Sequence, residues 1–163
     1  MFEKKIYLAI TPSTDFLLAV DEWKKHWSHL PVKWVEEGDL HITVIPPWLD
    51  VDIDNARKKL LDFKSRHSER INLYFNYVSF GPSRKHARLI WAEGVAPEKL
   101  ITLKNDLEQV FGLLNVGEPL RLHITLARFK EEDFANFPVQ DISQNIDWAC
   151  SVRDILLLES NSN

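Results

Sequence analysis

The chain has 163 residues, 45% of them hydrophobic, with a formal net charge of −4 and a pI near 5.9. This length and apolar fraction predict a single domain over residues 1–163 with a proper hydrophobic core, and the acidic balance argues against a broad duplex-binding surface. Cys150 is the one cysteine, which excludes an internal disulfide and a cysteine-rich metal site, and no apolar run reaches the roughly 20 residues of a membrane span.

The first half of the chain alternates between strand and helix patterns. Residues 1–5 lack the build of a signal peptide, so we expect a cytoplasmic protein, and we expect it to be a monomer. The predicted elements are a strand over 4–11, a helix over about 14–29, a short strand over 33–35, a turn over 36–39, a strand over 40–45 and a helix over 52–68. We expect Pro46-Pro47 to end the strand over 40–45, because proline cannot donate to a β ladder.

The second half repeats part of this order. It predicts a strand over 71–79, a turn over 81–83, a strand over 87–93, a helix over 97–112, a separator over 117–119, a strand over 121–128, a polar loop over 132–145 with one helical turn, a strand over about 148–158 and a tail over 159–163. The order strand, helix, strand in 4–45 recurs loosely in 87–128. This recurrence predicts two related halves around a pseudo-twofold axis.

One short phrase occurs twice, as His41-Ile42-Thr43-Val44 and His123-Ile124-Thr125-Leu126, each inside an apolar strand pattern. Alternate side chains of a strand share a face, so each histidine projects with its threonine while the apolar residues point into a core. Random order would give about 0.2 His-x-Thr triplets in a chain of this composition. A single copy is explained by the wet face of an antiparallel strand, but two copies with matching flanks favour a shared site.

These residues resemble the two-histidine (2H) phosphoesterase superfamily, and within it the bacterial and archaeal RNA 2′,3′-cyclic phosphodiesterases, also called 2′-5′ RNA ligases. The resemblance covers nearly the whole chain. It is carried by both His-x-Thr phrases, the opening strand 7–12, Trp34-Val35, Leu89-Ile90-Trp91, Ala127-Arg128 and the last strand 155–160. One stretch departs from the family: Ile45-Pro46-Pro47-Trp48 stands where many members carry an aromatic residue and a Leu-Gly pair.

The resemblance implies an α+β, bilobal fold, with two pseudo-symmetric lobes whose antiparallel sheets line a central cleft and whose helices lie outside. It also implies a reaction without a metal or a nucleotide cofactor. The residues agree, since two histidines lack a third and fourth ligand at any usual zinc spacing.

The implied activity is metal-independent hydrolysis of a 2′,3′-cyclic phosphate, at RNA ends or on nucleotides, to a 2′-phosphate, with 2′-5′ RNA ligation as the reverse reaction. Histidine is the natural proton carrier near neutral pH. The resemblance suggests His41 as the acid toward the leaving oxygen and His123 as the base on water. Thr43 and Thr125 would donate hydrogen bonds to the non-bridging oxygens.

Two arginines are candidates for holding the phosphate. Arg128 matches the arginine of the family's second motif, but strict alternation places it opposite His123 unless the strand ends or bulges first. Arg121 has the correct parity but flanks the site, where a solvated strand-edge arginine is the simpler interpretation. Trp48 either stacks on a base or anchors a packed loop.

Two alternatives to this function stay open. One is another 2H phosphodiesterase activity, on 2′-5′ oligoadenylate or cyclic ADP-ribose phosphate. The other is a phosphonucleotide-binding module without turnover, although both intact His-x-Thr pairs argue against it. Trp23, Trp27 and Trp91 are expected in the core, and so is Tyr7 unless it lines the cleft. We expect His26, His29, His67 and His86 on the surface, where the basic turn at His86 is either solvated or in contact with an RNA backbone.

Overall fold

The computed structural model describes residues 2–114 and 119–161. Its elements, in order, are β1 (Lys4–Ile10), α1 (Thr14–Lys25), β2 (Lys33–Trp34), the 3-10 helix η1 (Glu37–Asp39), β3 (Ile42–Asp50), α2 (Ile53–Arg66), β4 (Asn72–Gly81), β5 (Leu89–Gly94), α3 (Glu98–Phe111), β6 (Leu122–Arg128), the 3-10 helix η2 (Glu131–Asn136), β7 (Gln144–Ser151) and β8 (Ile155–Glu159). In this part of the chain, no helix is both long and apolar enough to cross a lipid bilayer.

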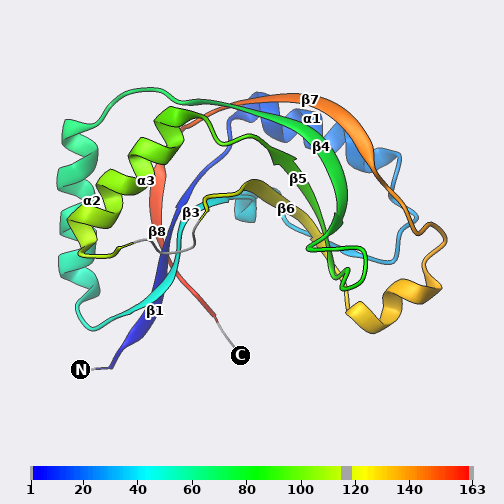
Figure 1. Ribbon diagram of the computed structural model, residues 1–163, viewed down its shortest axis with the longest axis horizontal. Coiled ribbons are helices and arrows are strands. Elements are labelled where there is room, and N and C mark those ends of the chain that lie inside the picture. Colours follow the sequence, from blue (N-terminus) through cyan, green and yellow to red (C-terminus); the bar gives the residue numbers. More distant parts are fainter. Residues whose placement is uncertain (1, 115–118, 162–163) are drawn as a thin grey trace.

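The strands form two antiparallel sheets, which confirms the predicted α+β class. The smaller sheet has the order β3-β1-β8 and the larger one the order β2-β6-β5-β4-β7. Figure 1 shows the larger sheet curling into an arch, with the smaller sheet at one end of it. The two sheets therefore differ in size and in the number of their strands.

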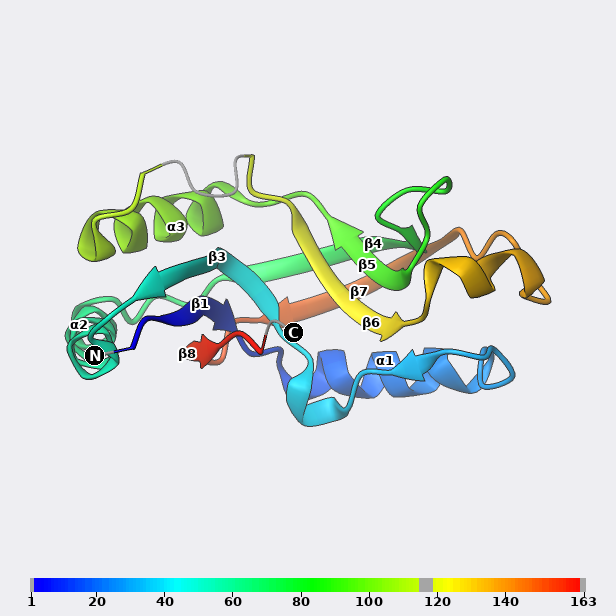
Figure 2. The same ribbon diagram turned by 90° about the horizontal axis from the view of Figure 1, so that it is seen from below.

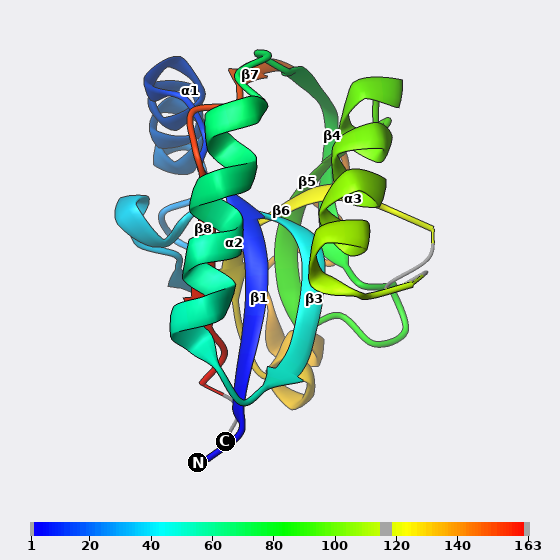
Figure 3. The same ribbon diagram turned by 90° about the vertical axis from the view of Figure 1, so that its left-hand side faces the viewer.

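The helices cover the outer faces of the sheets. Helix α1 packs against β7 of the larger sheet, whereas α2 contacts β8 and α3 contacts β3 of the smaller one. Figure 3 shows α2 and α3 side by side in front of β1 and β3. The faces that the helices leave uncovered are those on which the motif strands carry their polar side chains.

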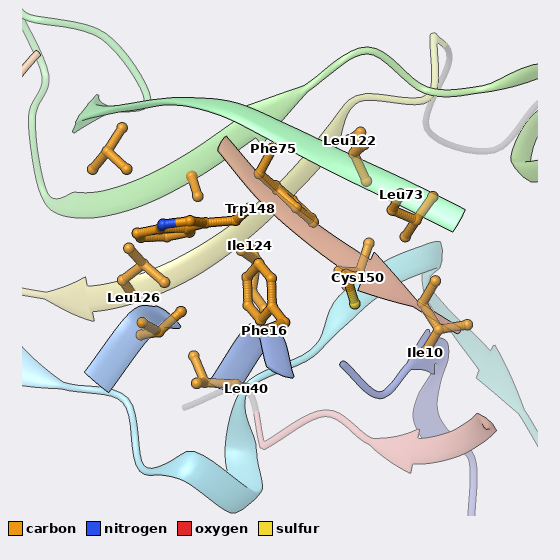
Figure 4. Close-up of a cluster of buried hydrophobic side chains, with 14 of the residues drawn as sticks. Ile10, Phe16, Leu40, Leu73, Phe75, Leu122, Ile124, Leu126, Trp148 and Cys150 are labelled. Atoms are coloured by element: carbon orange, nitrogen blue, oxygen red, sulfur yellow. The ribbon is translucent and has the colours of Figure 1, made fainter. Parts of the chain in front are cut away.

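Large apolar side chains from both sheets and from α1 meet in one core (Figure 4). The ring of Phe16 lies 5.1 Å from that of Phe75 and 5.8 Å from that of Trp148, centroid to centroid. Ile124 and Leu126 of β6 are completely buried in the same cluster. Each such side chain stabilises the fold by about 1.5–3 kcal/mol, so a one-residue slip that exposed several of them would be strongly disfavoured. The core thus fixes which face of β6 carries His123 and Thr125.

Strand β3 does not end at the two prolines, so that prediction was wrong. It continues to Asp50, and Ile6 of β1 pairs with Trp48 while Leu8 pairs with Ile45, which leaves one extra residue on β3 across the prolines. Proline is tolerated in edge strands and at bulges, where a ladder donor is not required. Strand β3 is an edge strand of its sheet and is bulged at this point.

The predicted final strand over 148–158 is divided between the two sheets. Strand β7 pairs with β4 and β8 pairs with β1, and the backbone turns between them at residues 152–154, where Asp154 Oδ1 accepts from the amide of Ile155 at 2.8 Å. An apolar run does not show where a strand changes sheets. The first helix also ends earlier than predicted, at Lys25, and most of the predicted separator over 117–119 lies outside the described residues.

Candidate active site

The two motif strands belong to different sheets but contact each other. Figure 2 views the molecule from the side on which β3 and β6 lie in front. A cavity of about 250 Å³ lies between them, and its lining residues are Val35, Asp39, His41, Thr43, His123, Thr125 and Arg128. The fold therefore brings together both histidines, both motif threonines and one of the two candidate arginines.

The size of this cavity limits what it can enclose. Pockets that bury a whole drug-sized ligand usually measure about 300–1,000 Å³, and 250 Å³ is below that range. It has room for a phosphate group and for part of the nucleotide attached to it.

Both histidine side chains are held in the same way. The Nδ1 atom of His41 lies 2.8 Å from the backbone carbonyl oxygen of Asp39, and the Nδ1 atom of His123 lies 2.9 Å from that of Arg121. A carbonyl oxygen only accepts, so each Nδ1 carries the hydrogen and each Nε2 is left for a ligand. Each ring can accept a proton at Nε2 when neutral, or donate one there when charged.

A bulge in β6 determines the face of the sheet to which Arg128 projects. Ile90 pairs with Ala127 and Trp91 pairs with Thr125, so one residue of β6 is extra between these pairs. Leu126 and Ala127 are both completely buried, whereas a regular strand would alternate. After the bulge, Arg128 is again on the face of Thr125, and it lines the cavity.

Arg121 lies just before β6 and does not line the cavity. Its guanidinium forms an ion pair with Glu93 and lies 4.3 Å from the centroid of the Trp91 ring. Its backbone carbonyl, rather than its charge, contacts His123. Of the two arginines that the sequence left open, the geometry favours Arg128 for the phosphate.

Asp39 and Val35 line the cavity, and sequence reasoning missed both. The predicted turn over 36–39 includes Asp39, which lies in the short helix η1. Strand alternation does not extend to a residue outside a strand, so it gave no signal for Asp39. The cavity consequently holds a carboxylate as well as a guanidinium.

Tyr7 and Trp91 place an aromatic ring beside each histidine. The ring of Tyr7 lies 5.5 Å from that of His41, and the ring of Trp91 lies 5.1 Å from that of His123. Trp91 is 6% exposed, as expected of a core residue, and its Nε1 donates to Ser79 Oγ at 3.2 Å. Tyr7 is only partly buried. The pKa of its hydroxyl is raised, mainly by burial and further by the negative charge of Asp39, with Arg128 acting in the opposite direction.

Trp48 packs away from the cavity. Its ring lies 5.4 Å from that of Phe111, and its Nε1 donates to Asp50 Oδ2 at 3.3 Å. This is the packed alternative of the two that the sequence left open, although the residue lies in β3 and not in a loop. The other histidines lie elsewhere: His26 and His67 end helices α1 and α2, His29 stacks on Trp27, and His86 pairs with Glu131 at 2.8 Å.

A larger hollow of about 1100 Å³ lies between the C-terminal end of α2, the N-terminal end of α3 and residues 151–155. Its lining mixes basic and acidic side chains, and Lys64 and Asp154 form an ion pair within it. It includes neither motif. In addition, residues 2–114 and 119–161 contain no cluster of three or more His, Cys, Asp or Glu side chains that could hold a metal ion.

Comparison with known proteins gives matches to a family and to solved structures. The family described as the 2′-5′ RNA ligase superfamily matches residues 12–163. No curated protein gives a significant match. TT0787 of Thermus thermophilus is similar in structure, with a TM-score of 0.68 and 18% identity over 94% of this chain and 86% of TT0787.

E. coli LigT in its apo form is similar too, with a TM-score of 0.67 and 20% identity over 99% of this chain and 90% of LigT. A LigT complex with 3′-AMP gives a TM-score of 0.66, also at 20% identity, over 99% of this chain and 91% of LigT. At these identities the structural matches show that the fold is shared.

Proposed function

The chain belongs to the 2′-5′ RNA ligase superfamily, and from this premise we propose that it is a phosphodiesterase that opens 2′,3′-cyclic phosphates, at RNA ends or on nucleotides, to 2′-phosphates. If the 5′-hydroxyl of a second RNA attacked the cyclic phosphate in place of water, the two ends would be joined through a 2′-5′ linkage, with the 3′ oxygen as the leaving group. One observation carries the proposal: two imidazoles, each anchored at Nδ1 by a backbone carbonyl, line one cavity of about 250 Å³.

Opening a cyclic phosphate with water requires a base for the water and an acid for the departing oxygen. In the proposed step, neutral His123 accepts a proton from water at Nε2 as the water oxygen bonds to phosphorus. The bond from phosphorus to the 3′ oxygen breaks, and charged His41 gives its Nε2 proton to that oxygen. The products are a 2′-phosphate and a 3′-hydroxyl, and exchange with solvent restores both rings.

Three further side chains suit the phosphoryl oxygens. Thr43 and Thr125 line the cavity beside the histidines, and a hydroxyl donates readily to a non-bridging oxygen. Arg128 lines the same cavity, and its planar guanidinium can donate two parallel hydrogen bonds to a phosphate. The charge that develops on the phosphoryl group would thus meet donors that the fold already holds in place.

The substrate class is supported by similarity as well as by cavity size. Solved structures of LigT include complexes with 3′-AMP, phosphate, ATP and NADP+. A nucleotide or an RNA terminus is the corresponding proposal for this chain. Its phosphate would occupy the cavity.

The test is product analysis with purified protein in EDTA. Four substrates are incubated in parallel: a 2′,3′-cyclic mononucleotide, an RNA with a terminal 2′,3′-cyclic phosphate, 2′-5′ oligoadenylate and cyclic ADP-ribose phosphate. We expect the first two to give 2′-phosphates, identified by ³¹P NMR, and the double variant His41→Ala/His123→Ala to give none.

Other outcomes would contradict the proposal in distinguishable ways. Turnover of only the third or fourth substrate would identify a different 2H phosphodiesterase activity. Binding of cyclic nucleotides without turnover would identify a phosphonucleotide-binding module that has no catalytic activity. Activity lost in EDTA and restored by a divalent ion would refute the metal-independent mechanism.

A further inference from the structure

Lys33 lies directly opposite Arg128 across the pairing of β2 with β6. Residues that oppose each other in an antiparallel pair project to the same face of the sheet. Val35, two residues after Lys33, lines the cavity together with Arg128, and its amide extends the pairing by donating to the carbonyl of Leu126 at 2.9 Å. Lys33 therefore shares the face of the cavity and continues it outward.

Lys33 and Arg128 are two of several basic side chains that form no ion pair in the described part of the chain. Lys64, Arg84 and Arg121, by contrast, each pair with a carboxylate. Like charges directly opposite each other in a sheet repel. An anion that contacts both side chains would remove this repulsion.

We propose that Lys33 and Arg128 form a second-phosphate subsite that receives the phosphodiester preceding the reacting end of an RNA chain. This inference rests on the proposed function and names its preferred substrate as RNA ends rather than mononucleotides. Lys33 does not line the cavity, so a mononucleotide whose single phosphate lies there leaves Lys33 without an anion. An RNA with a 2′,3′-cyclic end has its next phosphate on the 5′ side, outside the cavity.

The position of β2 at the edge of its sheet leaves room for an RNA strand. It is an edge strand of the larger sheet, so one of its sides has no neighbouring strand, and Lys33 is exposed. Glu36 and Glu37, both exposed, follow Val35 and place negative charge beyond it. The RNA backbone would therefore leave the cavity over Lys33 and not over η1.

The experiment compares two substrates in the wild type and in Lys33→Ala. Steady-state kinetics are measured for a 2′,3′-cyclic mononucleotide and for a short RNA that ends in the same cyclic nucleotide, across a range of salt concentrations. One lost phosphate contact reduces the slope of log affinity against log salt by about 0.7 for a single strand, which is about fivefold near 0.1 M salt. We expect the ratio of kcat/KM for RNA to that for the mononucleotide to fall by that amount.

Two variants serve as controls. Lys58→Ala removes an exposed lysine from α2, which carries none of the cavity residues, so it makes the same change in net charge and should leave the ratio unaltered. Lys33→Arg keeps the charge and should restore most of the ratio. An unchanged ratio in Lys33→Ala, or an equal fall in Lys58→Ala, would overturn the subsite.

A binding measurement separates this inference from the proposed function. Fluorescence anisotropy of a labelled RNA that ends in a 2′-phosphate, competed by the corresponding mononucleotide, gives both affinities without turnover. If the wild type cleaves no cyclic phosphate, the proposed function fails, and the RNA preference in this assay still decides the subsite. Equal preference in the wild type and Lys33→Ala would refute it.

Discussion

The two copies of the His-x-Thr phrase share a backbone hydrogen bond and a bulge, but the charged residues beside them differ. In both copies the histidine Nδ1 is held by the carbonyl two residues earlier, and an extra residue follows the threonine, where Val44-Ile45 and Leu126-Ala127 are buried in succession. The residue whose carbonyl is used is Asp39 in the first copy and Arg121 in the second. Five residues after each histidine stand Pro46 and Arg128.

The repeat thus provides two similar imidazoles, whereas the charged side chains around them differ between the two copies. The first copy contributes a carboxylate to the cavity, and the second contributes a guanidinium. The neighbouring strands differ as well, since Thr43 lies opposite Ala9 while Thr125 lies opposite Trp91. The two imidazoles are thus matched across the cavity, whereas the guanidinium comes from the second copy alone.

Removing either imidazole should have the largest effect. We expect His41→Ala and His123→Ala each to lower kcat on a 2′,3′-cyclic nucleotide by about 10²–10⁴-fold, since each removes a proton-transfer group. Neither ring is in the core, so melting temperatures should change little. Wild-type turnover by folded His123→Ala would show that the second copy is structural.

The pH dependence of the same variants tests the division of labour. The wild-type profile should be bell-shaped, because one ring must be charged while the other is neutral. His123→Ala should lose the fall on the acid side, and His41→Ala the fall on the alkaline side. The opposite pattern would exchange the two roles.

Substitution of the two arginines should change kcat/KM by amounts that differ more than tenfold. Arg128→Ala removes hydrogen bonds to a charged group, worth about 1.5–3 kcal/mol, so kcat/KM should fall by about 10–150-fold. Arg121→Ala leaves the mostly buried carboxylate of Glu93 without its ion-pair partner, so stability should fall by about 1–3 kcal/mol and kcat/KM should change little. Equal losses of kcat/KM would refute the assignment of Arg128.

Asp39→Asn should change the affinity of the cavity for phosphate anions of different charge. One imidazolium and Arg128 supply two positive charges and Asp39 one negative charge, which leaves a single positive charge to match a phosphodiester monoanion. Without the carboxylate, a dianionic 2′-monophosphate should bind about two- to fivefold more tightly, the effect of one charge of about 1 kcal/mol or less in a wet site. Inhibition constants of a nucleoside 2′-monophosphate and of a monoanionic dinucleoside phosphate measure it, and an equal gain for both would contradict it.

Tyr7→Phe should have the smallest effect, and it should be visible only at alkaline pH. The pKa of Tyr7 is raised by burial, so its neutral form stabilises the fold below the unfolded pKa of about 10, and this contribution is lost as pH rises through the folded value. Urea denaturation at pH 8 and pH 11 should therefore show a smaller alkaline loss for the variant. An equal loss in both proteins would place the Tyr7 hydroxyl in solvent.

The sequence predicted which motif residues lie together better than it predicted the sheets. Alternation in Leu40 to Val44 and in Leu122 to Leu126 is local, so the faces of both histidines followed from it. The choice of Arg128 needed a bulge, which depends on pairing with β5 and leaves no mark in local composition. Asp39 was missed because its own segment gives only turn signals.

The two wrong predictions for the strands have one cause. Whether Pro46-Pro47 ends a strand depends on that strand lying at an edge, and whether 148–158 is one strand depends on which sheet each part joins. Both are properties of the assembled sheets and not of the segments. The residue propensities of a segment therefore cannot predict its place in a sheet.

The prolines of β3 also bear on self-association. An edge strand offers unpaired backbone groups on which a second molecule can add a strand, and apolar side chains on such a strand increase that hazard. Leu49, in the same strand, is 62% exposed. Pro46 and Pro47 carry no N–H, so an incoming strand would find a break in the ladder beside Thr43. The outer part of β3 is thereby a poorer template for aggregation.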